Sequence, residues 1–246
     1  MEKEESVMYF KYLNVGGGPF EHREDGWANL DYKFEASAYK RKKYWGNIDI
    51  EYNLMSGKPM PILSDSYDAV YSEHTIEHLT EDMVLYLFKE VYRILKPGGV
   101  FRVSCPDADW FYDSLVSPGK HKESISDVWS VRKPDASPEY RFLDALCSPL
   151  SGVLTDQDVQ GMLTSMPKKV VFKALTSSVT TKEQADRPGE HNSCWNHLRL
   201  DKALTEAGFS TISQPLPPNE SSCEAFKAGY IDTTVPICSI RIEAVK

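Results

Sequence analysis

Residues 12–19 read YLNVGGGP, and this stretch decides the fold that the sequence predicts. Its first half is an apolar strand, which runs directly into three glycines and a proline. Because glycine lacks a Cβ, a glycine turn at the carboxyl end of a strand bends tightly and lets a ligand approach the backbone. The stretch alone therefore indicates a nucleotide-like ligand at a strand end, and the residues that follow must sharpen it.

The residues after the glycine turn favour an alternation of strands and helices. Strands are predicted at about 11–15, 27–31, 47–52, 67–72 and 100–105. A helix that begins after Thr80 precedes the last of these strands, and the sequence KPGG at residues 96–99 ends it. Strands that alternate with helices are typical of βαβ units, so we expect a parallel sheet with helices on both faces.

The second half of the chain interrupts this rhythm. Residues 113–190 are rich in Ser, Pro, Lys and Asp, with helix-like pieces only at about 139–147 and 156–163. A helix at 197–207, ended by Gly208, and strands at about 209–213 and 237–245 follow. Long interruptions of compact domains are often lids. We therefore expect one domain over residues 1–246, with residues 113–190 inserted as a region that covers the substrate.

Composition limits the functions that the chain can have. The formal net charge of the 246 residues is −8, which argues against a nucleic-acid or anionic-membrane partner, and the basic run at residues 40–43 is read as a solvated face. The sequence shows no signal peptide and no apolar run of the roughly 18 residues that a membrane span needs. Five scattered cysteines predict reduced thiols and hence a cytoplasmic protein.

Two common nucleotide-binding motifs do not fit the glycine turn. A dinucleotide-binding oxidoreductase requires G-x-G-x-x-G, but the third glycine position holds Glu21, whose carboxylate would repel a pyrophosphate. A P-loop requires G-K-[ST], which does not follow the turn. The sequence therefore disfavours both a dinucleotide-binding oxidoreductase and a P-loop protein.

The order of the remaining motifs resembles the class I S-adenosylmethionine-dependent methyltransferases. It is most similar to the type 11 branch and its relatives in polysaccharide biosynthesis. The resemblance covers residues 11–110 well and 191–213 loosely, and the LKPGG ending at residues 95–99 is its most recognisable piece. It implies a twisted, mostly parallel sheet of seven strands, with the last strand antiparallel, helices on both faces and S-adenosylmethionine as the cofactor.

The resemblance also implies the residues that hold this cofactor. The glycine turn would cradle its methionine part, and Asp31 would take the ribose hydroxyls, for which a carboxylate is suited because it accepts two hydrogen bonds. Asn53, followed by the apolar Leu54, would contact the adenine. The full set of expected cofactor residues is Asn14, Gly16, Gly17, Gly18, Asp31, Asn53, Leu54, Ser72 and His74.

The chain departs from the family at a few of these positions. Asn14 and Asn53 stand where many relatives have an acid, and only about nine residues separate Pro19 from Asn29. Both asparagines keep their hydrogen-bonding capacity but lose charge. The departures therefore put the affinity for the cofactor in question rather than the fold.

Methyl transfer to an alcohol requires a base, and histidine has a suitable pKa. The expected catalytic residues are His191, His74 and Asp107, where Asp107 would either orient the acceptor or cap the helix that follows it. His74 and His78 are four residues apart with Glu77 nearby, which could suggest a metal site. In the family that the chain resembles these residues line or support the cofactor pocket, so no metal is expected.

The sequence thus predicts methyl transfer from S-adenosylmethionine to a hydroxyl of a small-molecule or glycan acceptor. Two alternatives stay open: an N-methyltransferase of a small amine, and a cofactor-binding or scaffold protein that has lost catalysis. A homodimer is compatible with the sequence, which does not determine the oligomeric state.

Overall fold

The computed structural model describes residues 10–18, 26–33, 48–131, 133, 135–187, 189–227 and 231–246. Glu21 and the basic run at residues 40–43 lie outside this part of the chain. Among the described residues, no helix combines the length and the apolar character that a membrane crossing requires. The five cysteines are all free thiols.

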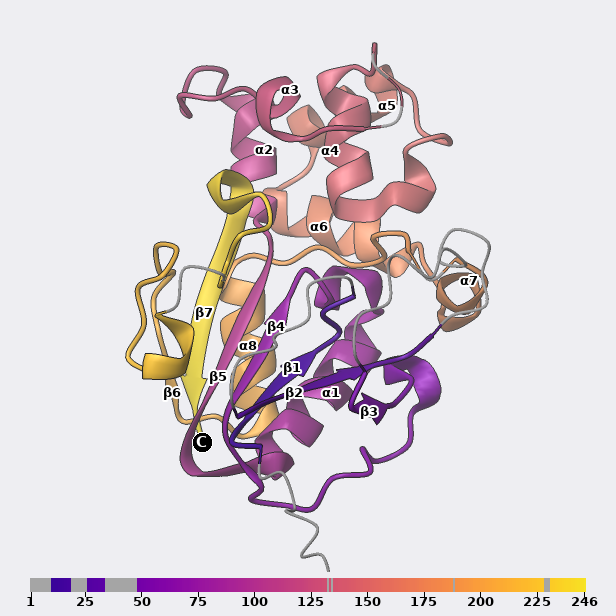
Figure 1. Cartoon of the computed structure of the whole chain (residues 1–246). Helices are drawn as coiled ribbons and strands as arrows, with labels where there is room; N and C mark the ends of the chain where they lie inside the picture. Colours follow the sequence, from indigo (N-terminus) through magenta and orange to yellow (C-terminus); the bar gives the residue numbers. More distant parts are fainter. Residues whose placement is uncertain are drawn as a thin grey trace, which may run out of the picture.

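The core of the molecule is a seven-stranded sheet in the order β3-β2-β1-β4-β5-β7-β6 (Figure 1). The strands β1 to β5 pair in parallel, whereas β7 is antiparallel to both of its neighbours. This arrangement confirms the predicted fold. The bounds are β1 Tyr12–Val15, β2 Trp27–Asp31, β3 Ile50–Glu51, β4 Tyr67–Glu73, β5 Leu95–Pro106, β6 Thr211–Ile212 and β7 Ser239–Val245.

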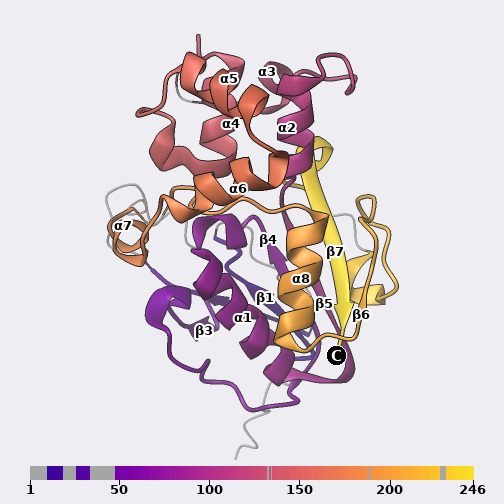
Figure 2. The same cartoon turned by 180° about the vertical axis from the view of Figure 1, so that it is seen from behind.

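One face of the sheet is covered by two helices, α1 (Glu81–Ile94) and α8 (His197–Ala207), which lie side by side in Figure 2. Their apolar stripes pack on strand residues such as Leu13 and Val70 in the main hydrophobic cluster, which we call the sheet core. Helix α8 matches its predicted bounds and ends at Gly208, whose φ of 114° lies in the left-handed region that favours glycine.

The opposite face is covered differently in the described part of the chain. Trp27 and Tyr71 pack there against Phe226, which belongs to the short helix η5 (Glu224–Phe226). Helices α1 and α8 meet the prediction of helices on the first face. Among the described residues, the only helix seen to cover the second face is the short η5.

A buried charge cluster lies on this second face. Arg102 of β5 is fully buried and pairs with Asp232 and Glu243, the latter its direct cross-strand neighbour on β7. The hydroxyl of Tyr71 donates to Asp232 Oδ1 at 3.3 Å, and the guanidinium also donates to the carbonyl of Glu220 at 2.9 Å. The charges of this cluster are thus paired and hydrogen-bonded, as burial requires.

Two local details around α1 differ from the sequence prediction. Thr80 is the residue before the helix, but its side chain makes no capping hydrogen bond; its backbone N–H instead donates to Gln184 Oε1 at 3.0 Å. The helix ends at Ile94 as expected, yet β5 begins at once with Leu95 and contains the KPGG sequence. The left-handed Gly98 and a shift in register between β4 and β5 absorb the glycines within the strand.

Residues 108–187 form a helical cap above the sheet (Figure 1). The predicted pieces at 139–147 and 156–163 are confirmed as α4 and α5. The cap has a hydrophobic cluster of its own, which we call the cap core, with Phe111, Phe142 and Phe172 fully buried or nearly so. Its helices are α2 Ala108–Val116, α3 Ile125–Val128, α4 Pro138–Cys147, α5 Asp156–Ser165, α6 Lys168–Ser177 and α7 Thr181–Asp186.

Candidate active site

The parallel strands end at the edge of the sheet that faces the cap. The order of strands reverses between β1 and β4, and in open α/β sheets ligands bind at such a reversal, beyond the carboxyl ends of the strands. The glycine turn follows β1, Asp31 ends β2, His74 follows β4 and Asp107 follows β5. The fold therefore brings the main predicted site residues to one edge.

The two ends of the glycine turn, Gly16 and Gly18, have different surroundings. Gly16 has a φ of 71°, and a Cβ there would lie 2.3 Å from Thr75 Cγ2. Thr75 also donates its hydroxyl hydrogen to the Gly16 carbonyl at 2.9 Å. Gly18 has a φ of 54°, but no described atom lies within 4 Å of the position of its Cβ. Among the described residues, the backbone at Gly18 is thus not covered by side chains, as a cradle for a ligand requires, with Gly17 between the two.

Asp31 is joined to this turn. Its Oδ2 accepts a hydrogen bond from the Gly18 N–H at 2.7 Å, and its Oδ1 accepts one from the Tyr32 N–H at 2.7 Å. Burial raises the pKa of Asp31, although these backbone donors oppose the increase. Each carboxylate oxygen can accept a further hydrogen bond, so Asp31 retains the capacity to bind a diol.

Three other predicted cofactor residues have local structural partners. Asn14 is buried and donates from Nδ2 to Asn29 Oδ1 at 3.1 Å. Ser72 is also buried, and its hydroxyl donates to the Val15 carbonyl at 3.1 Å. Asn53 accepts from the Met55 N–H and begins the short helix η2 (Leu54–Ser56). Asn14 and Ser72 therefore support the ends of β1 and β4 from inside the sheet.

His74 is held at both ring nitrogens. Its Nδ1 lies 3.1 Å from Glu77 Oε1, and its Nε2 lies 2.8 Å from Ser239 Oγ, a hydroxyl that also lies 2.9 Å from the Val235 carbonyl. A carbonyl can only accept, so the hydroxyl donates to Val235 and accepts from His74. Burial lowers the pKa of His74, but the Glu77 carboxylate outweighs it, so the pKa lies above its ordinary value.

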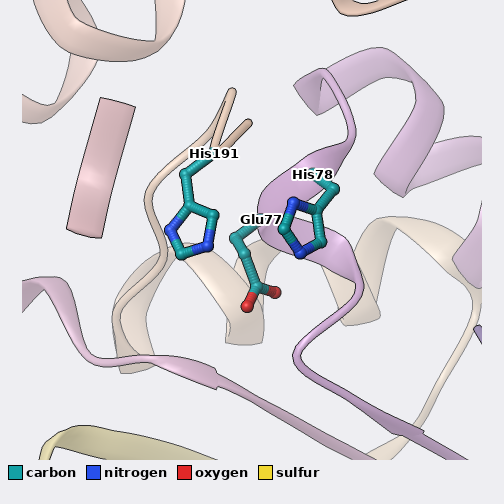
Figure 3. Close-up of side chains that lie close together, drawn as sticks. All are labelled: Glu77, His78 and His191. Atoms are coloured by element: carbon teal, nitrogen blue, oxygen red, sulfur yellow. The ribbon is translucent and has the colours of Figure 1, made fainter. Parts of the chain in front are cut away.

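Glu77 also lies close to His191 and His78, whose rings stand on either side of its side chain (Figure 3). The Nδ1 of His191 is 2.6 Å from the Ala145 carbonyl, and the ring packs edge-on against His78. Burial lowers the pKa of His191 to about 4. Burial raises the pKa of Glu77, but the adjacent imidazoles, that of His74 most strongly, outweigh it and lower the pKa to about 2.

Asp107 caps the first helix of the cap. Its Oδ1 accepts a hydrogen bond from the Asp109 N–H at 2.9 Å, so Asp107 has the capping role, one of the two that the sequence suggested. Its backbone N–H donates to the Cys238 carbonyl at 2.8 Å. Burial raises the pKa of Asp107 to about 6. The structure thus gathers His74 and His191 around Glu77, whereas Asp107 stands apart from them at the end of β5.

Sequence reasoning missed the partners that connect these residues. Thr75 locks Gly16, Ser239 holds His74, and Glu77 is the centre around which three histidines gather. Thr75 and Glu77 follow the strand predicted at 67–72. Nothing in the sequence indicates that Thr75 contacts Gly16 or that Glu77 lies near His191. Ser239 carries no local signal at all.

Comparison with known proteins finds similarity to methyltransferases. Residues 24–103 match a family model described as "Methyltransferase domain". A probable S-adenosylmethionine-dependent methyltransferase of Mycolicibacterium smegmatis is 35% identical over 91 residues, which are 37% of this chain and 32% of that protein. A sterol 24-C-methyltransferase of Clavispora lusitaniae is 35% identical over 78 residues, 32% of this chain and 20% of that protein.

The aligned part thus spans about a third or less of these curated relatives. Among solved structures, an S-adenosylmethionine-dependent methyltransferase from Mesorhizobium loti is 15% identical, with 97% of this chain and 93% of that chain covered and a TM-score of 0.45. One from Archaeoglobus fulgidus is 14% identical, with 97% and 88% covered and a TM-score of 0.43.

Two findings bear on the class of this protein, the family match and the sheet order. Residues 24–103, which include β2, β3 and β4 and reach into β5, match the methyltransferase domain. The seven-stranded sheet with its antiparallel last strands is the one expected for the class I, S-adenosylmethionine-dependent kind. The cofactor of this domain is S-adenosylmethionine. The backbone at Gly18, which no described side chain covers, and the adjacent carboxylate of Asp31 fit such a ligand.

Proposed function

We propose that this protein is a methyltransferase that moves a methyl group from S-adenosylmethionine to a hydroxyl of a small-molecule or glycan acceptor. The observation that carries the proposal is the contact between the Asp31 carboxylate and the Gly18 N–H, made where the strand order reverses. It sets a diol-binding carboxylate beside an open glycine turn, which is the pair of features that a nucleoside with an attached amino acid needs.

Residues at the ends of β1, β2 and β3 would hold the cofactor. Gly16, Gly17 and Gly18 would bind its amino-acid part through the backbone, and Asp31 would bind the ribose hydroxyls. Asn53, whose side chain already fixes the turn after β3, would place Leu54 against the adenine. The sulfonium of the bound cofactor supplies an activated methyl group, so the protein has to align the acceptor and accept its proton.

We propose Asp107 as the base that accepts this proton. The pKa of about 6 leaves its carboxylate ionised near neutral pH yet more basic than an ordinary aspartate. The two histidine candidates are less suitable, because both ring nitrogens of His74 are occupied and burial lowers the pKa of His191 to about 4, which makes it a weak base. His74 would then position the end of β4 rather than touch the acceptor.

The cap would cover the acceptor. Its first helix α2 begins at Asp107, so an acceptor bound beside this carboxylate lies between the edge of the sheet and the cap. A link to polysaccharide biosynthesis rests on sequence resemblance alone, and a sugar hydroxyl is the acceptor that it suggests.

Calorimetric titration with S-adenosylmethionine and S-adenosylhomocysteine tests the cofactor site. We expect Asp31→Ala to weaken binding by roughly 10- to 100-fold, which corresponds to the loss of charge-assisted hydrogen bonds. Asp68→Ala is the matched control, because Asp68 is a half-exposed carboxylate that pairs with Lys96. The proposal is wrong if the unaltered protein binds neither ligand, or if both variants bind alike.

A second measurement separates the acceptor classes. The protein is incubated with methyl-labelled cofactor and a panel of sugars, phenols and small amines, and label transfer is counted. Asp107→Asn should bind the cofactor normally but lose at least about 100-fold in transfer to a hydroxyl. Transfer to an amine that survives this substitution would favour the N-methyltransferase alternative, and cofactor binding without transfer to any acceptor would favour the scaffold.

A further inference from the structure

Glu77, His78 and His191 converge at the seam between the sheet and the cap. Glu77 and His78 belong to the short helix η3 (Ile76–His78) after β4, and His191 follows the cap. Each side chain offers one metal-ligand atom, and these atoms lie within 4.8 Å of one another. In Figure 3 the two imidazole rings flank the Glu77 side chain.

The carboxylate at the centre of this group has fewer partners than its burial requires. Glu77 is only 1% exposed, and within the described part of the chain its Oε2 accepts no hydrogen bond, while Oε1 pairs only with the imidazole of His74. His74 Nδ1 lies at an ion-pair distance of 3.1 Å from Oε1. A buried carboxylate normally receives several hydrogen bonds or binds a cation, so this side chain has capacity that its protein neighbours do not fill.

The two flanking histidines present lone pairs rather than hydrogens. The Nδ1 of His191 lies 2.6 Å from the Ala145 carbonyl, and the Nδ1 of His78 lies 3.2 Å from the Glu190 carbonyl. Because a carbonyl only accepts, both Nδ1 atoms carry the hydrogen, and in a neutral ring Nε2 is then an acceptor. Metal-bound histidines are oriented in this way, with the second ring nitrogen donating to a carbonyl.

We propose that Glu77, His78 and His191 bind a divalent transition-metal ion of the Zn²⁺ type. Two imidazoles and one carboxylate form a common ligand set for zinc, with water completing four ligands. Tetrahedral zinc at about 2.0–2.1 Å from each ligand requires ligand atoms about 3.3 Å apart. The side chains would therefore close by about 1.5 Å at most from the separation of up to 4.8 Å.

The backbone around the three ligands is already fixed. The Asn192 N–H donates to the Glu77 carbonyl at 2.6 Å, and Asn192 Nδ2 donates to the His78 carbonyl at 2.9 Å. The His191 N–H donates to Ser148 Oγ at the end of α4. The two histidines are partly exposed, which gives an ion access to the buried carboxylate. The ion would thus join η3 to the segment that leads into α8, which is itself hydrogen-bonded to the cap.

Metal binding here would reverse the expectation, taken from sequence resemblance, that no metal is bound. It is also separate from the proposed function, since it includes neither the glycine turn nor Asp31. His74 would not be a ligand but would position the Glu77 carboxylate from its outer side, as partners of metal-bound carboxylates do.

Zinc titration of the full chain tests the proposal. The protein, without an affinity tag, is treated with a chelator, and Zn²⁺ binding is measured by calorimetry and metal analysis. Co²⁺ then serves as a visible probe of four-coordinate geometry. We expect one ion per chain, with binding at least about tenfold weaker in Glu77→Gln and in His191→Ala. His197→Ala is the matched control, because His197 lies on α8 outside this group and should bind zinc like the unaltered protein.

Either of two results would overturn the site. One is a chain that binds no stoichiometric zinc. The other is equal zinc affinity in the unaltered protein and in a Glu77→Gln variant whose circular dichroism shows it folded, which would assign the binding to other groups such as the thiols. Cofactor binding by the same metal-free protein is measured in parallel, so a failure of the metal site is distinguishable from a failure of the proposed function.

Discussion

The sheet core and the cap core differ in how they are built. The sheet core fills the space between the strands and the two helices α1 and α8, whereas the cap core is assembled mainly from helices of four to ten residues. The proposed cofactor residues stand on the first, and the cap that would cover an acceptor depends on the second. If these roles hold, binding of the donor and coverage of the acceptor rest on two largely separate sets of contacts.

The largest expected effect comes from removing one phenylalanine from each core. Phe88 of the sheet core and Phe142 of the cap core are both almost completely buried, so replacement by alanine should cost about 3–5 kcal/mol in each case. Phe142→Ala should keep the affinity for S-adenosylmethionine and lose transfer to the acceptor, whereas Phe88→Ala should lower both. Urea unfolding and calorimetry provide the measurements. Equal losses of cofactor affinity would show that the cores act as one unit.

A smaller effect is expected within the glycine turn itself. Gly16→Ala places a Cβ against Thr75 in a left-handed backbone and should lower the free energy of unfolding by about 1–3 kcal/mol. Gly18→Ala meets no described atom within 4 Å, so it should cost about 1 kcal/mol yet weaken cofactor binding, because the new methyl group enters the cradle. Thermal unfolding measures the loss of stability in both variants, and cofactor titration measures the loss of binding. If Gly18→Ala binds normally, the ligand does not approach this side of the turn.

The smallest expected effect is on the pH dependence of stability, and it comes from Asp107, which follows β5 and caps the first helix of the cap. The pKa of Asp107 is raised to about 6, so the folded state favours its protonated form. This contribution to stability is complete below about pH 4 and is lost as the pH rises through 6. Asn keeps the helix cap but cannot ionise. Asp107→Asn should therefore gain stability over the unaltered protein, by about 1 kcal/mol, between pH 4 and pH 7.

Urea unfolding at a series of pH values measures this difference. A constant difference across the range would mean that Asp107 has an ordinary pKa, and Asp107 would then be a poorer base.

The sheet region was predictable because its signals are local. The bounds of β2 agree with the predicted 27–31, and α8 lies between the capping side chain of Asn196 and the left-handed Gly208. The KPGG sequence predicted the end of α1 correctly but not the start of β5, because glycines can also be absorbed by a register shift, which depends on the neighbouring strand.

The cap and the centre of the site were less predictable. Helix α6 buries Val171, Phe172 and Leu175 at helical spacing, but this short stripe is flanked by Ser, Thr and Lys and was not recognised. The group around Glu77 joins residues more than one hundred positions apart, and its geometry depends on the docking of α4. No local pattern encodes such a contact. The roles of the predicted cofactor and catalytic residues stay predictions.

The position of β7 has a consequence for biosynthesis. Val245 of this strand pairs with Val100 of β5, and the whole cap lies between them in the sequence. Strands β1 to β5 therefore leave the ribosome long before the partner that covers the edge of β5. An uncovered edge strand readily pairs with other chains, and contacts between distant residues form slowly. The nascent chain is thus most prone to aggregate while the cap is being synthesised, and closure by β7 ends that interval.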